Sequence, residues 1–195
     1  NGGVLAGGNF NQLNRPWAIG TWNKYYRDVL KHTTDVKRIT AGDPERTNLF
    51  NMARILHSLS AMILTDTFGD IPYFQAGTGF IDGIVNPVYD TQESIYQDIL
   101  EELEAASAGL NADNPIETGD IFYGGDIAKW KKLGYSLMLR AAFRHTKVDP
   151  AKAQEWTTKA IAGGLMESNE DNMVIFHDFN YVNELGNTLN ATEAN

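Results

Sequence analysis

Cysteine is absent from the 195-residue chain. Its absence excludes disulfide bonds, thiol catalysis, and zinc or iron–sulfur sites built on cysteine ligands. Long apolar runs are absent as well: the run at residues 61–64 falls far short of the roughly 20 residues that an α-helix needs to cross a bilayer. The visible sequence therefore predicts neither cysteine-based chemistry nor a membrane-spanning helix.

Positive charge is scarce. The chain has 16 Lys and Arg residues against 25 Asp and Glu residues, which gives a formal net charge of -9, and its basic residues form no cluster. Such a surface repels phosphate backbones, so no nucleic-acid partner is expected. Apolar residues make up 43% of the chain and aromatic residues 11%, which is enough for one substantial core. Aromatic side chains can fill that core or provide flat surfaces for ligands.

Motifs for catalysis and cofactor binding are missing too. The four histidines show no HExxH pattern and no pair four residues apart that would preset a metal site. Neither a GxSxG nucleophile turn nor a phosphate-binding glycine motif occurs. The carboxylates Glu101, Glu102 and Glu104 could suggest a glycosidase, but their place on a predicted helix favours a solvated face. We therefore expect no enzyme activity, no cofactor and no metal site.

Five segments have the 3.6-residue repeat of apolar side chains that is typical of amphipathic helices. They cover residues 17–39, 43 to beyond 63, 90–109, 126–147 and 149–163. In the first, the predicted apolar face consists of Trp22, Tyr25, Tyr26, Val29, Val36 and Ile39. Trp130 and Trp156 fall on apolar faces of later segments and are predicted to be buried.

Several of these helices carry recognisable start signals. Asp43-Pro44 and Asp149-Pro150 each combine an N-cap residue with proline at the first helical position. Asp90 and Glu93 have the spacing of a capping box. Residues 163–164 are a glycine pair suited to ending the last helix.

Small and basic side chains on residues 126–147 predict contacts with neighbouring helices. Gly134, Ala141 and Ala142 are small enough to let another helix come close. Arg140 and Arg144 lie one turn apart, and we expect them to pair with carboxylates of a neighbouring helix.

A segment rich in Gly and Pro, residues 69–89, separates the second and third predicted helices. It is too apolar for disorder, so we expect an ordered loop held against the helices by Tyr73, Phe74 and Phe80. Residues 172–179 could form a short strand.

The last three predicted helices, joined by short polar turns, resemble a tetratricopeptide-type array. Trp130, Leu133 and Gly134 have the opening spacing of that repeat, but Leu137 takes the place of its tyrosine and the later positions do not match. The predicted fold class is all-α, an antiparallel tetratricopeptide-like helical array with long ordered loops.

The stretch GGNFNQLNRPW, residues 7–17, is the strongest candidate for ligand binding. Amide groups, one guanidinium and two aromatic rings occur within eleven residues, which suits the hydroxyl groups and C–H faces of sugars. The candidate residues are Phe10, Asn11, Gln12, Asn14, Arg15 and Trp17. The alternative is an ordinary polar loop that leads into a helix.

Three motifs in one order resemble a known family. FGDIPYF at residues 68–74, GDIFYGGDIAKWKKLGYSLMLRAAFRHTKVDPAKA at residues 119–153 and GGLMESNEDN at residues 163–172 are similar to SusD/RagB-like proteins. The likeness is to the branch described as starch-binding and associated with the outer membrane. It covers residues 17–172, most of the chain.

The resemblance implies a non-enzymatic lipoprotein on the outward face of a Gram-negative outer membrane. Such a protein captures an oligosaccharide or similar nutrient and passes it to a TonB-dependent barrel transporter of the SusC type. Family members are much longer and carry an N-terminal lipid anchor, so residues 1–195 are expected to be one incomplete helical domain, without its lipoprotein signal and C-terminal half. The alternative function is a helical-repeat scaffold that binds only proteins.

Overall fold

The computed structural model describes the backbone of residues 15–175 and the side chains from residue 19 onward. Its elements, in order, are α2 (Arg15–Asn23), the π-helical η1 (Lys24–Leu30), α3 (Lys31–Thr40), the 3₁₀ turn η2 (Pro44–Arg46), α4 (Thr47–Phe68), α5 (Gly79–Asp82), α6 (Gln92–Gly109), α7 (Ile127–Arg144), α8 (Pro150–Gly163) and the 3₁₀ turn η3 (Asn169–Asp171). Residues 15–175 contain no strand, and the predicted all-α class is confirmed. The strand expected at residues 172–179 is absent from residues 172–175, and its remainder lies outside the described residues.

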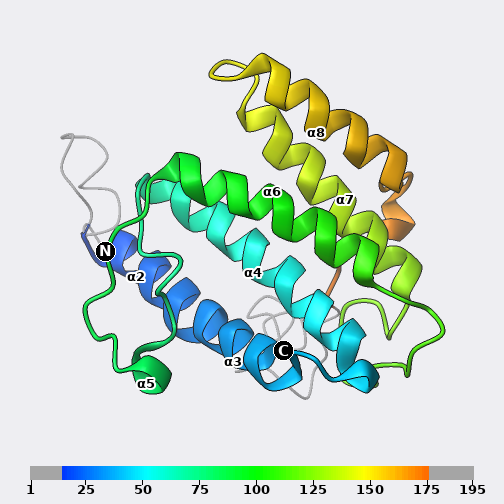
Figure 1. Cartoon of the computed structure of the whole chain (residues 1–195), viewed down its shortest axis with the longest axis horizontal. Coiled ribbons are helices and arrows are strands. Elements are labelled where there is room, and N and C mark those ends of the chain that lie inside the picture. Colours follow the sequence, from blue (N-terminus) through cyan, green and yellow to red (C-terminus); the bar gives the residue numbers. More distant parts are fainter. Residues whose placement is uncertain (1–14, 176–195) are drawn as a thin grey trace, which may run out of the picture.

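The long helices run antiparallel in one array (Figure 1). α4 packs between α3 and α6, α6 packs on α7, and α7 packs on α8, so from α4 onward each long helix contacts the long helix before it. This is the arrangement expected of tetratricopeptide-like helix pairs.

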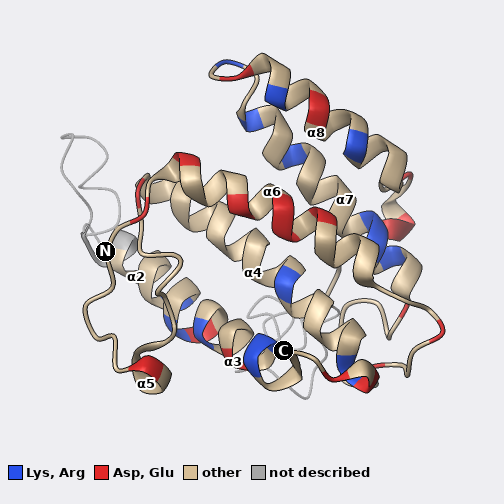
Figure 2. Cartoon of the chain, viewed as in Figure 1, with Lys and Arg blue, Asp and Glu red and all other residues tan. Residues whose placement is uncertain are grey.

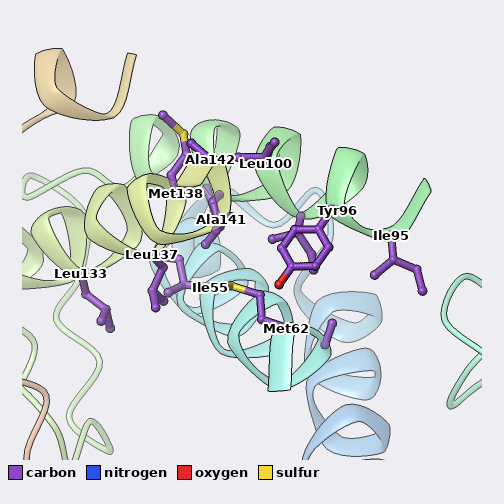
Figure 3. Close-up of a cluster of buried hydrophobic side chains, with 14 of the residues drawn as sticks. Ile55, Met62, Ile95, Tyr96, Leu100, Leu133, Leu137, Met138, Ala141 and Ala142 are labelled. Atoms are coloured by element: carbon purple, nitrogen blue, oxygen red, sulfur yellow. The ribbon is translucent and has the colours of Figure 1, made fainter. Parts of the chain in front are cut away.

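The core lies between α4, α6 and α7, where Ile55, Met62, Leu100 and Met138 are fully buried (Figure 3). Each such side chain stabilises the fold by about 1.5–3 kcal/mol relative to exposure. Trp130 and Trp156 are also buried, which confirms the prediction for both.

Close helix packing at Gly134 and the two alanines is confirmed as well. Ala141 and Ala142 have no exposed surface. A Cβ atom added at Gly134 would clash with the hydroxyl oxygen of Ser107 on α6 and lie 3.1 Å from Cδ1 of Ile55 on α4. Only glycine allows α7 to approach both helices this closely.

Side-chain caps begin most of the long helices. Asp149 accepts a hydrogen bond from the backbone N–H of Lys152, and Asp43 accepts one from Glu45 at the turn that leads into α4. The cap of α6 differs from the prediction: Thr91, and not Asp90, accepts the backbone N–H of Ser94. Asp90 is instead engaged by the preceding loop, as described below.

The first predicted helix is interrupted by the seven-residue π-helix η1. A π turn holds more residues than an α turn, so the apolar repeat read at 3.6 residues per turn loses its register beyond it. Leu30 and Thr33 are buried, whereas Ile39, predicted to lie on the apolar face, has 69% of its surface exposed. The prediction for Ile39 is wrong for this reason.

Residues 69–89 are ordered, but the predicted roles of their aromatic residues are only partly right. Tyr73 is buried as expected, whereas Phe74 has 53% of its surface exposed and Phe80 is fully exposed. Successive side chains of an extended segment point to opposite sides, which separates Tyr73 from Phe74. Phe80 belongs to the one-turn helix α5, which lies at the edge of the array (Figure 1). The expectation that Phe80 holds the loop in place is therefore wrong.

Charged residues are distributed along the helices (Figure 2). Acidic residues are frequent along α6, while basic residues are frequent on α7. Arg144 pairs with Asp66 at the end of α4, which confirms its predicted role. Arg140 forms no ion pair within the described part of the chain, so its prediction fails there.

Candidate functional site

Aromatic side chains from three segments meet beside the junction of α2 and η1. The ring of Trp22 lies 4.5 Å from that of Tyr26, 5.1 Å from that of Phe68 and 6.5 Å from that of Tyr89, measured between centroids. Phe68 ends α4 and Tyr89 precedes α6, so the chain brings distant segments together here. We call Trp22, Tyr26, Phe68 and Tyr89 the aromatic cluster.

Hydrogen bonds to the neighbouring motif hold the cluster in place. The Tyr26 hydroxyl donates to the carbonyl oxygen of Pro72 over 2.7 Å. Burial raises the pKa of Tyr26, and the acidic groups of Tyr89 and Asp90 raise it further, so this hydroxyl stays protonated and remains a donor.

The backbone of residues 71–74 is fixed by Asp90. Ile71 and Asp90 exchange backbone hydrogen bonds of 3.2 and 2.9 Å as an isolated antiparallel bridge. The Asp90 carboxylate also accepts the backbone N–H groups of Tyr73 and Phe74, at 2.8 and 3.0 Å. These hydrogen bonds fix the segment that follows α4 to the residue that precedes α6 by two positions.

The cluster offers one face to solvent. Tyr89 has 66% of its surface exposed, and its ring stacks on the partly buried Trp22 at an interplanar angle of 27°. A rigid, supported aromatic face of this kind suits the apolar C–H side of a sugar ring. This arrangement supports non-covalent binding.

The residues predicted from the sequence as a sugar site adjoin this cluster along the chain. Phe10, Asn11, Gln12 and Asn14 lie outside the described residues. Arg15 and Trp17 belong to the first turns of α2, and Trp22 follows Trp17 on the same helix about 7.5 Å further along its axis. The six predicted residues stay a prediction.

Sequence reasoning missed the part played by Tyr89. It treated Trp22 and Tyr26 as one apolar helix face and Tyr89 as the end of a loop. The sequence does place aromatic residues before and after the FGDIPYF motif, namely Trp22 and Tyr26 before it and Tyr89 after it. Their presence does not indicate which of the rings are in contact.

Two cavities lie elsewhere in the array, away from the aromatic cluster. One, of about 530 Å³, lies among Asp66, Tyr96, Arg144 and Lys152, where the Tyr96 hydroxyl donates to Asp66 over 2.6 Å. The other, of about 550 Å³, is mainly apolar and lies between α3, α4 and residues 116–122. Neither presents an exposed aromatic face comparable to that of Tyr89.

A sequence profile of the family described as starch-binding and associating with the outer membrane, SusD-like, matches residues 7–190. The match spans almost the whole chain. The chain belongs to this SusD-like family. Comparison with curated protein sequences gives no match.

Solved structures of SusD-like proteins agree with this assignment. A chitin-binding protein is 38% identical over 83% of this chain and 34% of its own, with a TM-score of 0.77. A SusD-like protein from Bacteroidetes AC2a is 32% identical over 81% of this chain and 29% of its own, with a TM-score of 0.73. A chitin-binding SusD homologue from Flavobacterium johnsoniae is 30% identical over 77% of this chain and 32% of its own, with a TM-score of 0.69. The chain thus spans about a third of the length of these relatives.

Within residues 15–175, no helix is both long and apolar enough to span a membrane. In the same part of the chain, no group of three or more His, Asp or Glu side chains is placed to hold a metal ion.

Proposed function

We propose that this SusD-like chain is part of a non-enzymatic outer-membrane protein that captures an oligosaccharide or similar nutrient. The observation that carries the proposal is the exposed face of Tyr89, whose ring stacks on Trp22. Trp22 belongs to α2, the helix that also contains Arg15 and Trp17 of the predicted sugar site. In this proposal Phe10 and Trp17 extend the aromatic surface, while Asn11, Gln12, Asn14 and Arg15 supply hydrogen bonds to sugar hydroxyls.

The descriptions of two relatives make chitin oligomers the first ligands to test. Both the 38%-identical and the 30%-identical structures are described as chitin-binding. Oligomers of N-acetylglucosamine carry apolar sugar faces and acetyl methyl groups that an aromatic surface can cover. They are therefore the first probe.

The family also supports a location and a partner. We propose that residues 1–195 form one helical domain of a larger, outward-facing lipoprotein, since the solved relatives are about three times as long as the matched region. In this proposal the captured glycan passes to a SusC-like TonB-dependent transporter. Co-purification of the full-length protein with a barrel transporter from outer membranes is the expected result.

Calorimetric titration with a panel of neutral oligosaccharides tests the proposal, followed by chromatography of the recovered sugars. We expect N-acetylglucosamine oligomers to bind and to be recovered intact. Sugar cleavage that a single carboxylate-to-amide change abolishes would contradict the non-enzymatic function. A chain that binds the transporter but no sugar would instead support the protein-binding scaffold.

A further inference from the structure

A second cleft, separate from the aromatic cluster, lies next to the motif at residues 68–74. Its volume is about 200 Å³, which is enough for one small chemical group. It lies between α3, α4, α6 and the loop at residues 73–78, and the residues that matter here are Lys37, Tyr73, Phe74, Thr78, Asp98 and Glu102. We call it the acidic cleft.

The walls of the acidic cleft are fixed by the fold. The ring of Tyr73 lies 5.7 Å from that of His57 and 5.0 Å from that of Phe74. Gly77 has a φ of 78°, and a Cβ atom there would lie 3.0 Å from the Thr34 hydroxyl. The loop therefore lies directly on α3, in a turn that a larger residue would strain.

The two carboxylates of the cleft differ in their partners. Glu102 accepts two hydrogen bonds of 2.9 Å from Arg54 and lies 3.5 Å from the Lys37 ammonium. Asp98 accepts one hydrogen bond of 2.6 Å, from the Tyr73 hydroxyl. Among residues 19–175, no Lys or Arg side chain pairs with Asp98.

The environment of Asp98 makes this lack of a cation costly. Burial raises the pKa of Asp98, and the charge of Glu102 adds to the rise; the Tyr73 hydrogen bond and the more distant charge of Lys37 oppose it without cancelling it. A partly buried carboxylate without a cationic partner is stabilised when a positive group binds beside it. Both nearby cations, Lys37 and Arg54, face Glu102, so Asp98 is the carboxylate of the cleft that has no ion-pair partner of its own among residues 19–175.

Phe74 supplies a second attraction for a cation. More than half of its surface is exposed, and it lines the same cleft as Asp98. An ammonium group placed there would donate a charge-assisted hydrogen bond to the carboxylate and make a favourable contact with an aromatic ring. A neutral sugar hydroxyl can also donate to the carboxylate, but it brings no positive charge to attract the carboxylate or the aromatic ring.

We propose that the acidic cleft binds the ammonium group of an amino sugar, so that the chain prefers glycans with free glucosamine units over their N-acetylated equivalents. The proposal rests on the proposed function in assuming a glycan ligand. It adds that Asp98 and Phe74 determine specificity for a free amine.

The test compares oligomers of glucosamine and of N-acetylglucosamine, equal in length, by titration calorimetry of the 195-residue chain. The buffer should be acidic enough to keep the sugar amine protonated. We expect Asp98→Asn to weaken binding of the glucosamine oligomer at least about tenfold, the scale of one lost charge-assisted hydrogen bond. Binding of the N-acetylated oligomer should be unchanged.

Glu101→Gln is the matched control, because Glu101 is an exposed carboxylate on the same helix and does not line the cleft. It should bind both oligomers like the wild type. Phe74→Ala, at an exposed position, should weaken glucosamine binding without loss of folding. Thermal melts of each variant separate a binding effect from unfolding.

Equal affinity of the wild type for the two oligomers would overturn the inference, as would unchanged glucosamine binding in a folded Asp98→Asn variant. If Tyr89→Ala weakens both oligomers while Asp98→Asn weakens neither, the proposed function stands and the amine-specific cleft does not. If no oligomer binds at all, both fail.

Discussion

Arg54 and Glu102 form a two-pronged ion pair that joins α4 to α6: Nε to Oε2 and Nη2 to Oε1 are both 2.9 Å apart. Only 14% of the Arg54 side chain and 24% of the Glu102 side chain are exposed. Lys37 of α3 approaches the same carboxylate at 3.5 Å. One side chain therefore links three helices directly beside the acidic cleft.

Replacing that carboxylate should cost stability. Glu102→Gln removes the charge that both cations face, and we expect the free energy of unfolding to fall by about 1.5–3 kcal/mol. Glu101→Gln, at an exposed position one residue away, should stay within about 0.5 kcal/mol of the wild type. Urea unfolding of the two variants measures the difference. Equal stability of both would show that the pair contributes nothing.

His57 should make stability depend on pH. Burial, and next the charge of Lys37, lower the pKa of His57 from 6.5 to about 3, against the opposing effect of Glu102. The folded state thus keeps the imidazole neutral, while the unfolded chain takes up a proton below pH 6.5. The stabilising contribution is complete above that pH and is lost as pH falls toward 3.

Urea unfolding at pH 7 and pH 5 measures this effect. The wild type should lose about 2 kcal/mol between the two values. His57→Gln should be less stable at pH 7, because it disrupts the contact of 2.9 Å with the Thr33 hydroxyl, but it should lack this loss. The same decrease in both proteins would argue against a neutral buried histidine.

Asp120 should be essential to the turn before α7. Its carboxylate accepts the indole N–H of Trp130 at 2.7 Å and the backbone N–H groups of Phe122, Tyr123 and Gly125 at 2.9 to 3.2 Å. Asp120→Ala leaves these donors unpaired and should cost about 2–4 kcal/mol. Asp120→Asn keeps one acceptor oxygen and should cost less. Chemical denaturation would contradict the assignment if alanine were tolerated as well as asparagine.

Gly134→Ala should destabilise the protein although alanine favours helix formation. The added methyl group meets Ser107, and overpacking of this kind costs about 1–3 kcal/mol. Ser107→Ala removes the clashing oxygen, so the double variant should recover much of the loss. If the two substitutions changed the free energy of unfolding additively in a double-mutant cycle, the strain would not arise from the contact between residues 134 and 107.

Much of the fold could be predicted from the sequence because its signals are local. Asp149-Pro150 marks the start of α8 through contacts within one turn. The π-helix η1 could not be predicted, since the apolar repeat carries no sign of a wider turn, and Ile39 was misplaced as a result. Phe80 was expected to pack against the helices because its loop is apolar, yet its side chain is fully exposed.

The candidate site was less predictable because it depends on contacts between distant residues. Trp22 and Tyr89 belong to separate segments, and periodicity within either one cannot reveal their stacking. Glu101 and Glu102 looked alike as parts of a solvated face. The structure leaves Glu101 exposed but buries much of Glu102 against Arg54.

Calorimetric titration of N-acetylglucosamine oligomers into the wild type and Tyr89→Ala tests glycan capture at the aromatic cluster most directly. Covering one aromatic face contributes about 1.5–3 kcal/mol, so the exposed Tyr89 should be replaceable without loss of folding while affinity falls about tenfold or more. Phe80→Ala, at a fully exposed aromatic residue outside the cluster, is the control and should bind normally. Wild-type affinity in a folded Tyr89→Ala variant would contradict capture at this surface.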